Sequence, residues 1–310
     1  MPSVITHYLS AEKVKEQLQV RLYDEAFYCG AQGPDMLLLH RKLPWLLGAN
    51  LNKAGSELHK ADPAETFGFL NEYFKKNNND IVKSYIIGFV CHYALDCTLH
   101  PYVHAMEEFY AQTAEEHTPG MTRTSMHHQI ETMLDIIALR GVTGQEPTKF
   151  RLTKAFTSDA QVKNAVVRLY EFLLTKQLSM NSHPLSKMIE QSFKDTRRVF
   201  STLNNTWLVK RWIVTGGEKL FKIPKRYSSL MRPILEDDDF DYSNQAGRPW
   251  TNPFTEEEST QGFLQLLDEA TQRAVLLVNA FLDQTLVQKA GHLSFDGEPT
   301  QEAEKAGQQA

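Results

Sequence analysis

Histidine, the commonest metal ligand in proteins and the usual proton carrier near neutral pH, is concentrated in the first part of this 310-residue chain. Nine of its 11 histidines lie within the first 128 residues. Such crowding points to a metal site or a proton-transfer site. The spacing of these histidines relative to the carboxylates has to decide between them.

The sharpest local pattern is His92, Asp96 and His100, three polar side chains spaced four residues apart in an otherwise apolar segment. On a helix this spacing places all three on one face, about one turn apart. Burying them is costly unless they are paired with one another or bound to a metal. The pattern therefore predicts either a metal site or a hydrogen-bonded network in the core.

Five further residues carry ligand-type side chains but are less specific when taken alone. His127 and Glu131 share a helical face, yet such pairs are common on solvated helices. Asp35 follows a Gly-Pro turn, where a carboxylate is more often a cap. His59 and His7 are single histidines, and His7 lies five residues after Pro2.

The helix that must hold the first pattern is indicated by the long apolar run over residues 80–99. Asp80 is a good N-cap for it, and the run marks the helix as central and buried. Pro101 lacks a backbone donor and restricts His100, so we expect this helix to end or kink there.

Helical spacing of apolar residues continues through the rest of the chain. Strand-like alternation is scarce, and no internal repeat or clear linker divides the sequence. We expect an all-α protein with one helical domain over residues 1–290, metal ligands within 2–135, and a flexible polar tail over residues 291–310. Other predicted helices lie near residues 10–22, 64–76, 105–116, 124–139, 158–178, 183–204, 206–222 and 256–287.

Composition excludes several classes of protein. With 42% hydrophobic and 23% charged residues the chain has an ordinary globular composition, and no apolar stretch is long enough to span a membrane. The net charge of -5 argues against nucleic-acid binding over the whole surface. Three cysteines and the absence of a recognisable signal peptide predict a cytoplasmic location.

Taken together, the His92-x3-Asp96 helix, the following His-x3-acid pair and the order of the other elements resemble the zinc-dependent phospholipase C family. The pattern also resembles the related trinuclear-zinc single-strand nucleases. The resemblance covers at least residues 2–135. It implies an all-helical enzyme that hydrolyses a phospholipid or another phosphodiester by metal-bound hydroxide, with two to three Zn²⁺ ions as cofactors.

The resemblance also implies a ligand set and two catalytic carboxylates. Asp35 would orient or deprotonate the attacking water, and Glu131 would be the second catalytic carboxylate. Asp135 would hold the side chain of His127 or Glu131 in position for metal binding. The implied ligands are Asp35, His59, His92 and Asp96 for one zinc; His100, His127 and Glu131 for a second; and Asp96, His7 and the amino terminus of Pro2, exposed once Met1 is removed, for a third.

The chain departs from the family pattern at two places. The third ligand on the helix usually lies six residues after the aspartate, whereas here His100 lies four and His104 eight residues after Asp96. We favour His100, because a spacing of four keeps it over the same helical face. The other departure is Pro2, which replaces a bulky aromatic terminus at the position of a ligand to the third zinc.

Several alternatives remain open. The protein could be a nuclease of the related type or a non-catalytic zinc protein. Cys91 and Cys97 could be soft metal ligands, although small buried residues are the commoner case. The basic, aromatic stretch from Trp207 to Lys222 could contact a phospholipid surface or stacked bases, or it could bury its aromatics and expose its lysines. His40, His104, His117 and His128 are expected at the surface or in satisfied polar positions.

Overall fold

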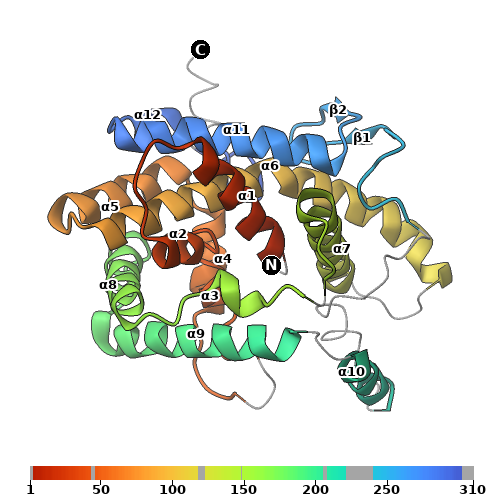
Figure 1. Ribbon diagram of the computed structural model, residues 1–310, viewed down its shortest axis with the longest axis horizontal. Coiled ribbons are helices and arrows are strands. Elements are labelled where there is room, and N and C mark those ends of the chain that lie inside the picture. The colour runs from red at the N-terminus through yellow and green to blue at the C-terminus, as the bar shows by residue number, and fades with distance from the viewer. Residues whose placement is uncertain are drawn as a thin grey trace.

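The computed structural model describes residues 3–42, 46–117, 123–147, 149–204, 208–220 and 240–301. Helices dominate this part of the chain (Figure 1), which confirms the predicted all-α class. The helices are α1 (Val4–Gln17), α2 (Asp24–Gly30), α3 (Asp35–Leu38), α4 (Asn52–Lys60), α5 (Pro63–Lys76), α6 (Asp80–His117), α7 (Arg123–Thr143), the 3-10 helix η1 (Leu152–Ala155), α8 (Ala160–Gln177), α9 (Ser182–Leu203), α10 (Leu208–Leu220), α11 (Phe263–Leu282) and α12 (Leu286–Lys289).

The described strands form a single small hairpin, in which β1 (Trp250–Thr251) pairs antiparallel with β2 (Glu258–Ser259). This hairpin corrects the prediction of a helix beginning at residue 256. The last long helix begins only at Phe263, because Gly262 precedes it in an extended conformation and its backbone N–H is bound by the side chain of Gln265.

The long helix α6 lies at the centre of the molecule and packs against α1, α2, α7 and α11 (Figure 1). Of the two alternatives predicted at Pro101, an end or a kink, the end of the helix is wrong, because α6 continues through this residue to His117. An internal proline costs a helix about 3 kcal/mol or more. Tertiary packing outweighs that cost, since Leu99, Tyr102 and Val103 on either side of the proline are all buried.

The close approach of α2 to α6 depends on a glycine. A Cβ atom at Gly88 would lie 2.1 Å from the carbonyl oxygen of Phe27, a distance that no side chain tolerates. With glycine there, the backbones of the two helices come into direct contact. The turn that follows α2 is thereby brought against the face of α6 that carries His92.

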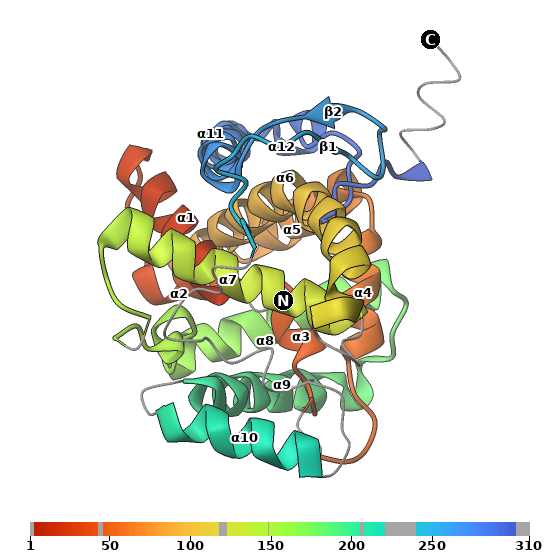
Figure 2. The ribbon, with the colours of Figure 1, turned by 90° about the vertical axis from the view of Figure 1, so that its right-hand side faces the viewer.

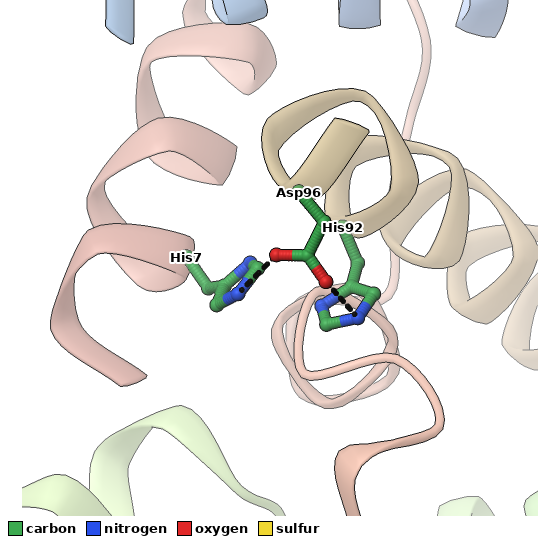
Figure 3. Close-up of side chains that lie close together, drawn as sticks. All are labelled: His7, His92 and Asp96. Carbon is green, nitrogen blue, oxygen red and sulfur yellow. Dashed lines mark ion pairs between the residues drawn. The ribbon is translucent and has the colours of Figure 1, made fainter. Parts of the chain in front are cut away.

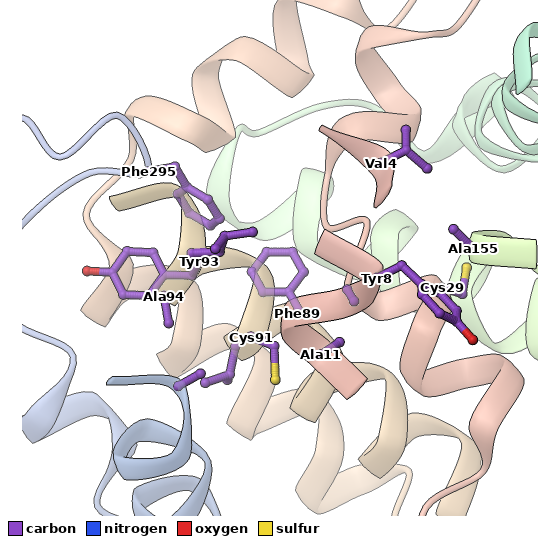
Figure 4. Close-up of a cluster of buried hydrophobic side chains, with 14 of the residues drawn as sticks. Val4, Tyr8, Ala11, Cys29, Phe89, Cys91, Tyr93, Ala94, Ala155 and Phe295 are labelled. Carbon is purple, nitrogen blue, oxygen red and sulfur yellow. The ribbon is translucent and has the colours of Figure 1, made fainter. Parts of the chain in front are cut away.

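The C-terminal strap, residues 291–301, differs from the flexible tail expected from residue 291 onward. Phe295 is fully buried and packs on Tyr93 and Phe89 of α6 (Figure 4). A single aromatic residue within a polar segment is enough to anchor the segment to the core. Residues 302–310 of the expected tail lie outside the described residues.

Helix α10 lies at the edge of the molecule on the side opposite α11 (Figure 2). The alternative in which the aromatics of this stretch are buried is wrong for Trp212, which is 80% exposed, and Ile213 and Leu220 are exposed beside it. Trp207, Phe221 and Lys222 lie outside the described residues. None of the helices described here is long and apolar enough to cross a membrane.

Candidate metal centre

Ligand-type side chains from five helices and from the C-terminal strap converge on one pocket. The cavity has a volume of about 160 Å³ and opens between α1, α3, α4, α6 and α7. Seven of the side chains predicted from the sequence line it. These are His7, Asp35, His59, Asp96, His100, His127 and Glu131, joined by Leu38, Ser56 and Asp296.

Asp96 lies between two imidazole rings at the base of this pocket (Figure 3). Its Oδ1 atom is 3.1 Å from Nε2 of His7, and its Oδ2 atom is 3.1 Å from Nε2 of His92. The two oxygens of one carboxylate therefore face different histidines. Such a carboxylate can bridge two metal ions, which is the role that the family resemblance implies for Asp96.

A second group joins Asp35 and His59 to the same His92. Oδ1 of Asp35 is 3.0 Å from Nε2 of His59. The turn before Asp35 requires glycine, because Gly33 has a φ angle of 49° and a Cβ atom there would lie 2.1 Å from Cδ2 of His92. The Gly-Pro turn thus lets the backbone lie directly on the His92 ring while it presents Asp35 to the pocket.

The third group consists of His100, His127 and Glu131. Oε1 of Glu131 lies 3.8 Å from Nε2 of His100 and 3.5 Å from Nε2 of His127. Nε2 of His100 is also 3.9 Å from Oδ1 of Asp96, which links this group to the first one.

His104 belongs to a neighbouring group with Glu107 and His127. Its Nδ1 atom is 2.9 Å from Oε2 of Glu107, and that same oxygen is 3.4 Å from Nδ1 of His127. His100, and not His104, therefore lies beside Glu131. The choice of His100 over His104 as a ligand stays a prediction.

Three of the histidines lie between a backbone carbonyl and a carboxylate. In each, Nε2 faces a carboxylate, and Nδ1 donates a hydrogen bond to a backbone carbonyl. Burial lowers the pKa of His92, and this neutral ring has its one N–H on Nδ1, so its Nε2 atom brings a lone pair to within 3.1 Å of a negatively charged oxygen of Asp96, which is repulsive. A cation between the two removes this repulsion, and this is the usual arrangement of metal-bound histidine. The pairs are His59 with Gly55 (2.7 Å), His92 with Ala31 (3.2 Å) and His100 with Phe295 (3.0 Å).

The carboxylates of the pocket are held in their ionised form. Burial on its own would raise the pKa of Asp96, but the histidines around it hold that pKa well below its ordinary value. The same opposition applies to Glu131, whose pKa is lowered by surrounding positive charges that include His127. Burial would also raise the pKa of Asp35, and the hydrogen bond from His59 lowers it. Ionised carboxylates are the form that binds metal.

The distances and the donor atoms both fit zinc. Zinc–ligand bonds of about 2.0–2.2 Å place neighbouring atoms of a tetrahedral shell ~3.3 Å apart. Within the three groups, the carboxylate oxygens and histidine Nε2 atoms in contact are separated by 3.0–3.9 Å. Nitrogen and oxygen donors without thiolate are typical of catalytic zinc sites. None of the candidate metal groups among the described residues contains cysteine.

The start of α1 is held in place from α7. Oδ1 of Asp135 accepts hydrogen bonds from both the backbone N–H and the hydroxyl of Thr6, each at 2.8 Å. Asp135, expected to support His127 or Glu131, therefore fixes the residue next to His7. Pro2, the remaining predicted ligand, lies outside the described residues.

Two residues at the site were missed by reasoning from the sequence. Glu107 offered a signal, because it follows His104 by three residues on the same helix. Asp296 offered none, since it lies far along the chain from every other residue of the pocket. His40 was misjudged in another way: it is completely buried, and within the described residues neither of its ring nitrogens has a hydrogen-bond partner.

A comparison with known families identifies the family of this chain. The family model of zinc dependent phospholipase C matches residues 5–179, more than half of the sequence. The chain belongs to the zinc-dependent phospholipase C family. No curated protein and no solved structure matches the chain. The matched segment contains every ligand candidate from His7 to Glu131, while the C-terminal strap lies outside it. Membership and the candidate metal groups together support a zinc phospholipase-like function.

Proposed function

We propose that this protein is a zinc-dependent hydrolase of phosphodiester bonds, similar in action to phospholipase C. The observation that carries the proposal is the convergence of histidines and ionised carboxylates on one pocket, beside which neutral, buried His92 has a carboxylate oxygen of Asp96 3.1 Å from its Nε2 atom. We place the protein in the cytoplasm. Two to three zinc ions would be bound by the ligands that the family resemblance implies. These ligands are His7, Asp35, His59, His92, Asp96, His100, His127 and Glu131, with the amino terminus of Pro2 as a further one.

Zinc, when bound, would activate water near neutral pH and neutralise negative charge on the phosphate. The chain would contribute orientation and proton transfer. Asp35 lines the pocket from a stiff turn and is ionised, so it can align a water molecule and accept its proton. Glu131 would hold His100 and His127 on the opposite side of the cavity, with Asp96 between the two halves.

The size of the pocket limits what can enter it. Its volume of about 160 Å³ is well below the ~300–1,000 Å³ that is typical of sites enclosing a whole ligand. A phosphate group and the atoms bonded to it would fit, while the remainder of the substrate would stay outside. A phosphodiester presented at a surface, such as a phospholipid headgroup, suits this arrangement.

Helix α10 favours a lipid surface over a nucleic acid. Trp212, Ile213 and Leu220 lie on one side of this helix and are all exposed. An aromatic ring alone would also suit stacking on bases, but the two aliphatic side chains would not. An exposed apolar face with a tryptophan is typical of peripheral membrane contact. We therefore place a phospholipid ahead of single-stranded nucleic acid as substrate.

The proposal is tested by loading the purified protein with zinc and assaying three substrates: phosphatidylcholine vesicles, single-stranded DNA and a chromogenic phosphodiester. We expect turnover of the lipid and of the chromogenic substrate, and at least a 100-fold loss of turnover in Asp35→Asn and Glu131→Gln. Asp80→Asn, which alters an exposed carboxylate at the start of α6, is the matched control and should keep full activity.

Each outcome separates the proposal from its rivals. Turnover of DNA alone would favour the nuclease. Bound zinc without turnover of any substrate would favour a non-catalytic zinc protein. Unchanged turnover in both Asp35→Asn and Glu131→Gln would refute the proposed catalytic roles.

A further inference from the structure

The C-terminal strap is fixed to α6 and α4 through Phe295. The buried ring of Phe295 lies 5.1 Å from that of Tyr93 and 5.8 Å from that of Phe89, measured between centroids (Figure 4). Its backbone N–H donates a hydrogen bond of 3.0 Å to the carbonyl oxygen of His59. Both the side chain and the backbone of this residue are therefore committed to elements that carry ligands.

On one side of Phe295 the strap fits against the proline of α6. A Cβ atom at Gly297 would lie 2.6 Å from Cγ of Pro101 and 2.8 Å from the carbonyl oxygen of Cys97. That carbonyl is the one whose helical partner a proline at position 101 removes. Gly297 also has a φ angle of 76°, so glycine is required here for two independent reasons.

The strap is also held to the start of α5. Nδ1 of His292 and the hydroxyl of Thr300 each lie 2.8 Å from Oδ2 of Asp62. Residues on both sides of Phe295 thus contact the same carboxylate. A segment held in this way has a defined position over the pocket.

Between these anchor points the strap faces His100. Nδ1 of His100 donates a hydrogen bond of 3.0 Å to the carbonyl of Phe295 and lies 3.3 Å from Oδ1 of Asp296. The other ring nitrogen, Nε2, faces Glu131 and Asp96. The side chain of Asp296 is 30% exposed and lines the pocket.

We infer that Asp296, together with the carbonyl of Phe295, is a positioning pair that fixes the ring orientation and tautomer of His100 so that its Nε2 atom can bind metal. A proton kept on Nδ1 leaves Nε2 free as a ligand, and a neighbouring carboxylate makes that ligand more basic. The inference rests on the proposed metal centre and adds a part of the chain outside the matched family segment.

The test measures zinc retention rather than turnover. Zinc-loaded protein is equilibrated with graded concentrations of a chelator, and the zinc remaining per chain is determined by elemental analysis. Loss of a residue that supports a metal-bound histidine weakens metal binding about 10- to 100-fold. In Asp296→Ala we expect the affinity for one zinc per chain to fall by this factor. The remaining zinc should be retained as in the wild type.

Two further variants set the scale of this effect. Asp296→Asn keeps an oxygen acceptor but loses the charge, so it should recover part of the affinity. Glu298→Gln alters an exposed carboxylate on the same strap and should bind zinc as the wild type does. A thermal melt of each variant confirms that it is folded.

A double variant shows whether Asp296 acts through His100. His100→Ala removes the ligand itself, so adding Asp296→Ala to it should weaken zinc binding no further. An additional 10-fold loss in the double variant would mean that Asp296 acts on the metal by another route, and would overturn the inference.

The outcomes for the two proposals are distinct. Wild-type zinc retention in Asp296→Ala overturns this inference whatever the activity of the protein. A wild-type protein that binds zinc but hydrolyses no phosphodiester contradicts the proposed function. In that case the effect of Asp296 on zinc affinity still decides the inference.

Discussion

Asp96 shares its two oxygens among three imidazoles: His7 and His92 at 3.1 Å, and His100 at 3.9 Å. A purely structural network of this kind would need positive charge on the rings. Burial lowers the pKa of His92, which therefore is neutral near pH 7. A neutral His92 that donates from Nδ1 to Ala31 has only a lone pair to turn toward Asp96. The chemistry of this one ring calls for a cation.

The pH dependence of zinc binding is predicted from two other histidines. Burial would lower the pKa of His59 and His100, but neighbouring carboxylates raise both above the ordinary value of 6.5. Without metal, both rings are protonated at that pH, and zinc must displace those protons. The apparent zinc affinity should therefore rise as pH increases through about 6.5, and level off only above the raised pKa values.

Titration calorimetry in two buffers with different ionisation enthalpies measures this proton release directly. The lowered pKa values of Asp96 and Glu131 mean that these carboxylates contribute no protons near neutral pH. A zinc affinity that does not change between about pH 6 and 8, with no protons released, would contradict the predicted ligand set.

At the scale of the elements, the turn between α2 and α3 is the most sensitive part of the site. Gly33→Ala would force a methyl group into the His92 ring in addition to straining a positive φ angle. We expect loss of at least one bound zinc and a drop in stability. The matched control is Gly144→Ala, where φ is 66° but nothing lies within 4 Å of the added Cβ.

The two glycine variants are compared by zinc content and thermal melting. Gly144→Ala should cost about 1 kcal/mol from backbone strain alone and keep its zinc. If Gly33→Ala also kept all of its zinc, the close approach of the turn to His92 would not matter for the metal centre.

The ligand face of α6 could be predicted from the sequence, because spacing by four residues is a local property of a helix. The pairing of His127 with Glu131 on α7 was predicted for the same reason. The course of α6 through Pro101 could not be, since it depends on packing against segments far along the chain. The strap was missed because Phe295 is a single apolar residue in a polar stretch, and its contacts with His59 and His100 have no local signature.

At the scale of the whole molecule, the proposed lipid substrate predicts that the exposed apolar face of α10 contacts the membrane surface. Trp212→Ala should lower turnover of phosphatidylcholine vesicles about 10-fold, since burial of a large apolar side chain is worth ~1.5–3 kcal/mol. Turnover of the soluble chromogenic phosphodiester should stay the same, because none of the side chains that the structure describes on α10 lines the pocket.

Leu276→Ala is the control for this surface, since Leu276 is an exposed apolar residue on α11 rather than α10. Its vesicle turnover should match that of the wild type. If Trp212→Ala lost turnover equally on vesicles and on the soluble substrate, the substitution would have damaged the fold. If it lost no turnover on either substrate, α10 would have no role in contacting the lipid.

Side chains from separate helices have to enclose metal ions for the proposed function, and anomalous X-ray diffraction at the zinc absorption edge tests this most directly. Crystals of zinc-loaded protein should show one peak among Asp35, His59, His92 and Asp96, and a second among His100, His127 and Glu131. Glu131→Gln should lose or weaken the second peak and keep the first. Crystals that show no anomalous peak in the pocket, or peaks only elsewhere on the molecule, would contradict the account.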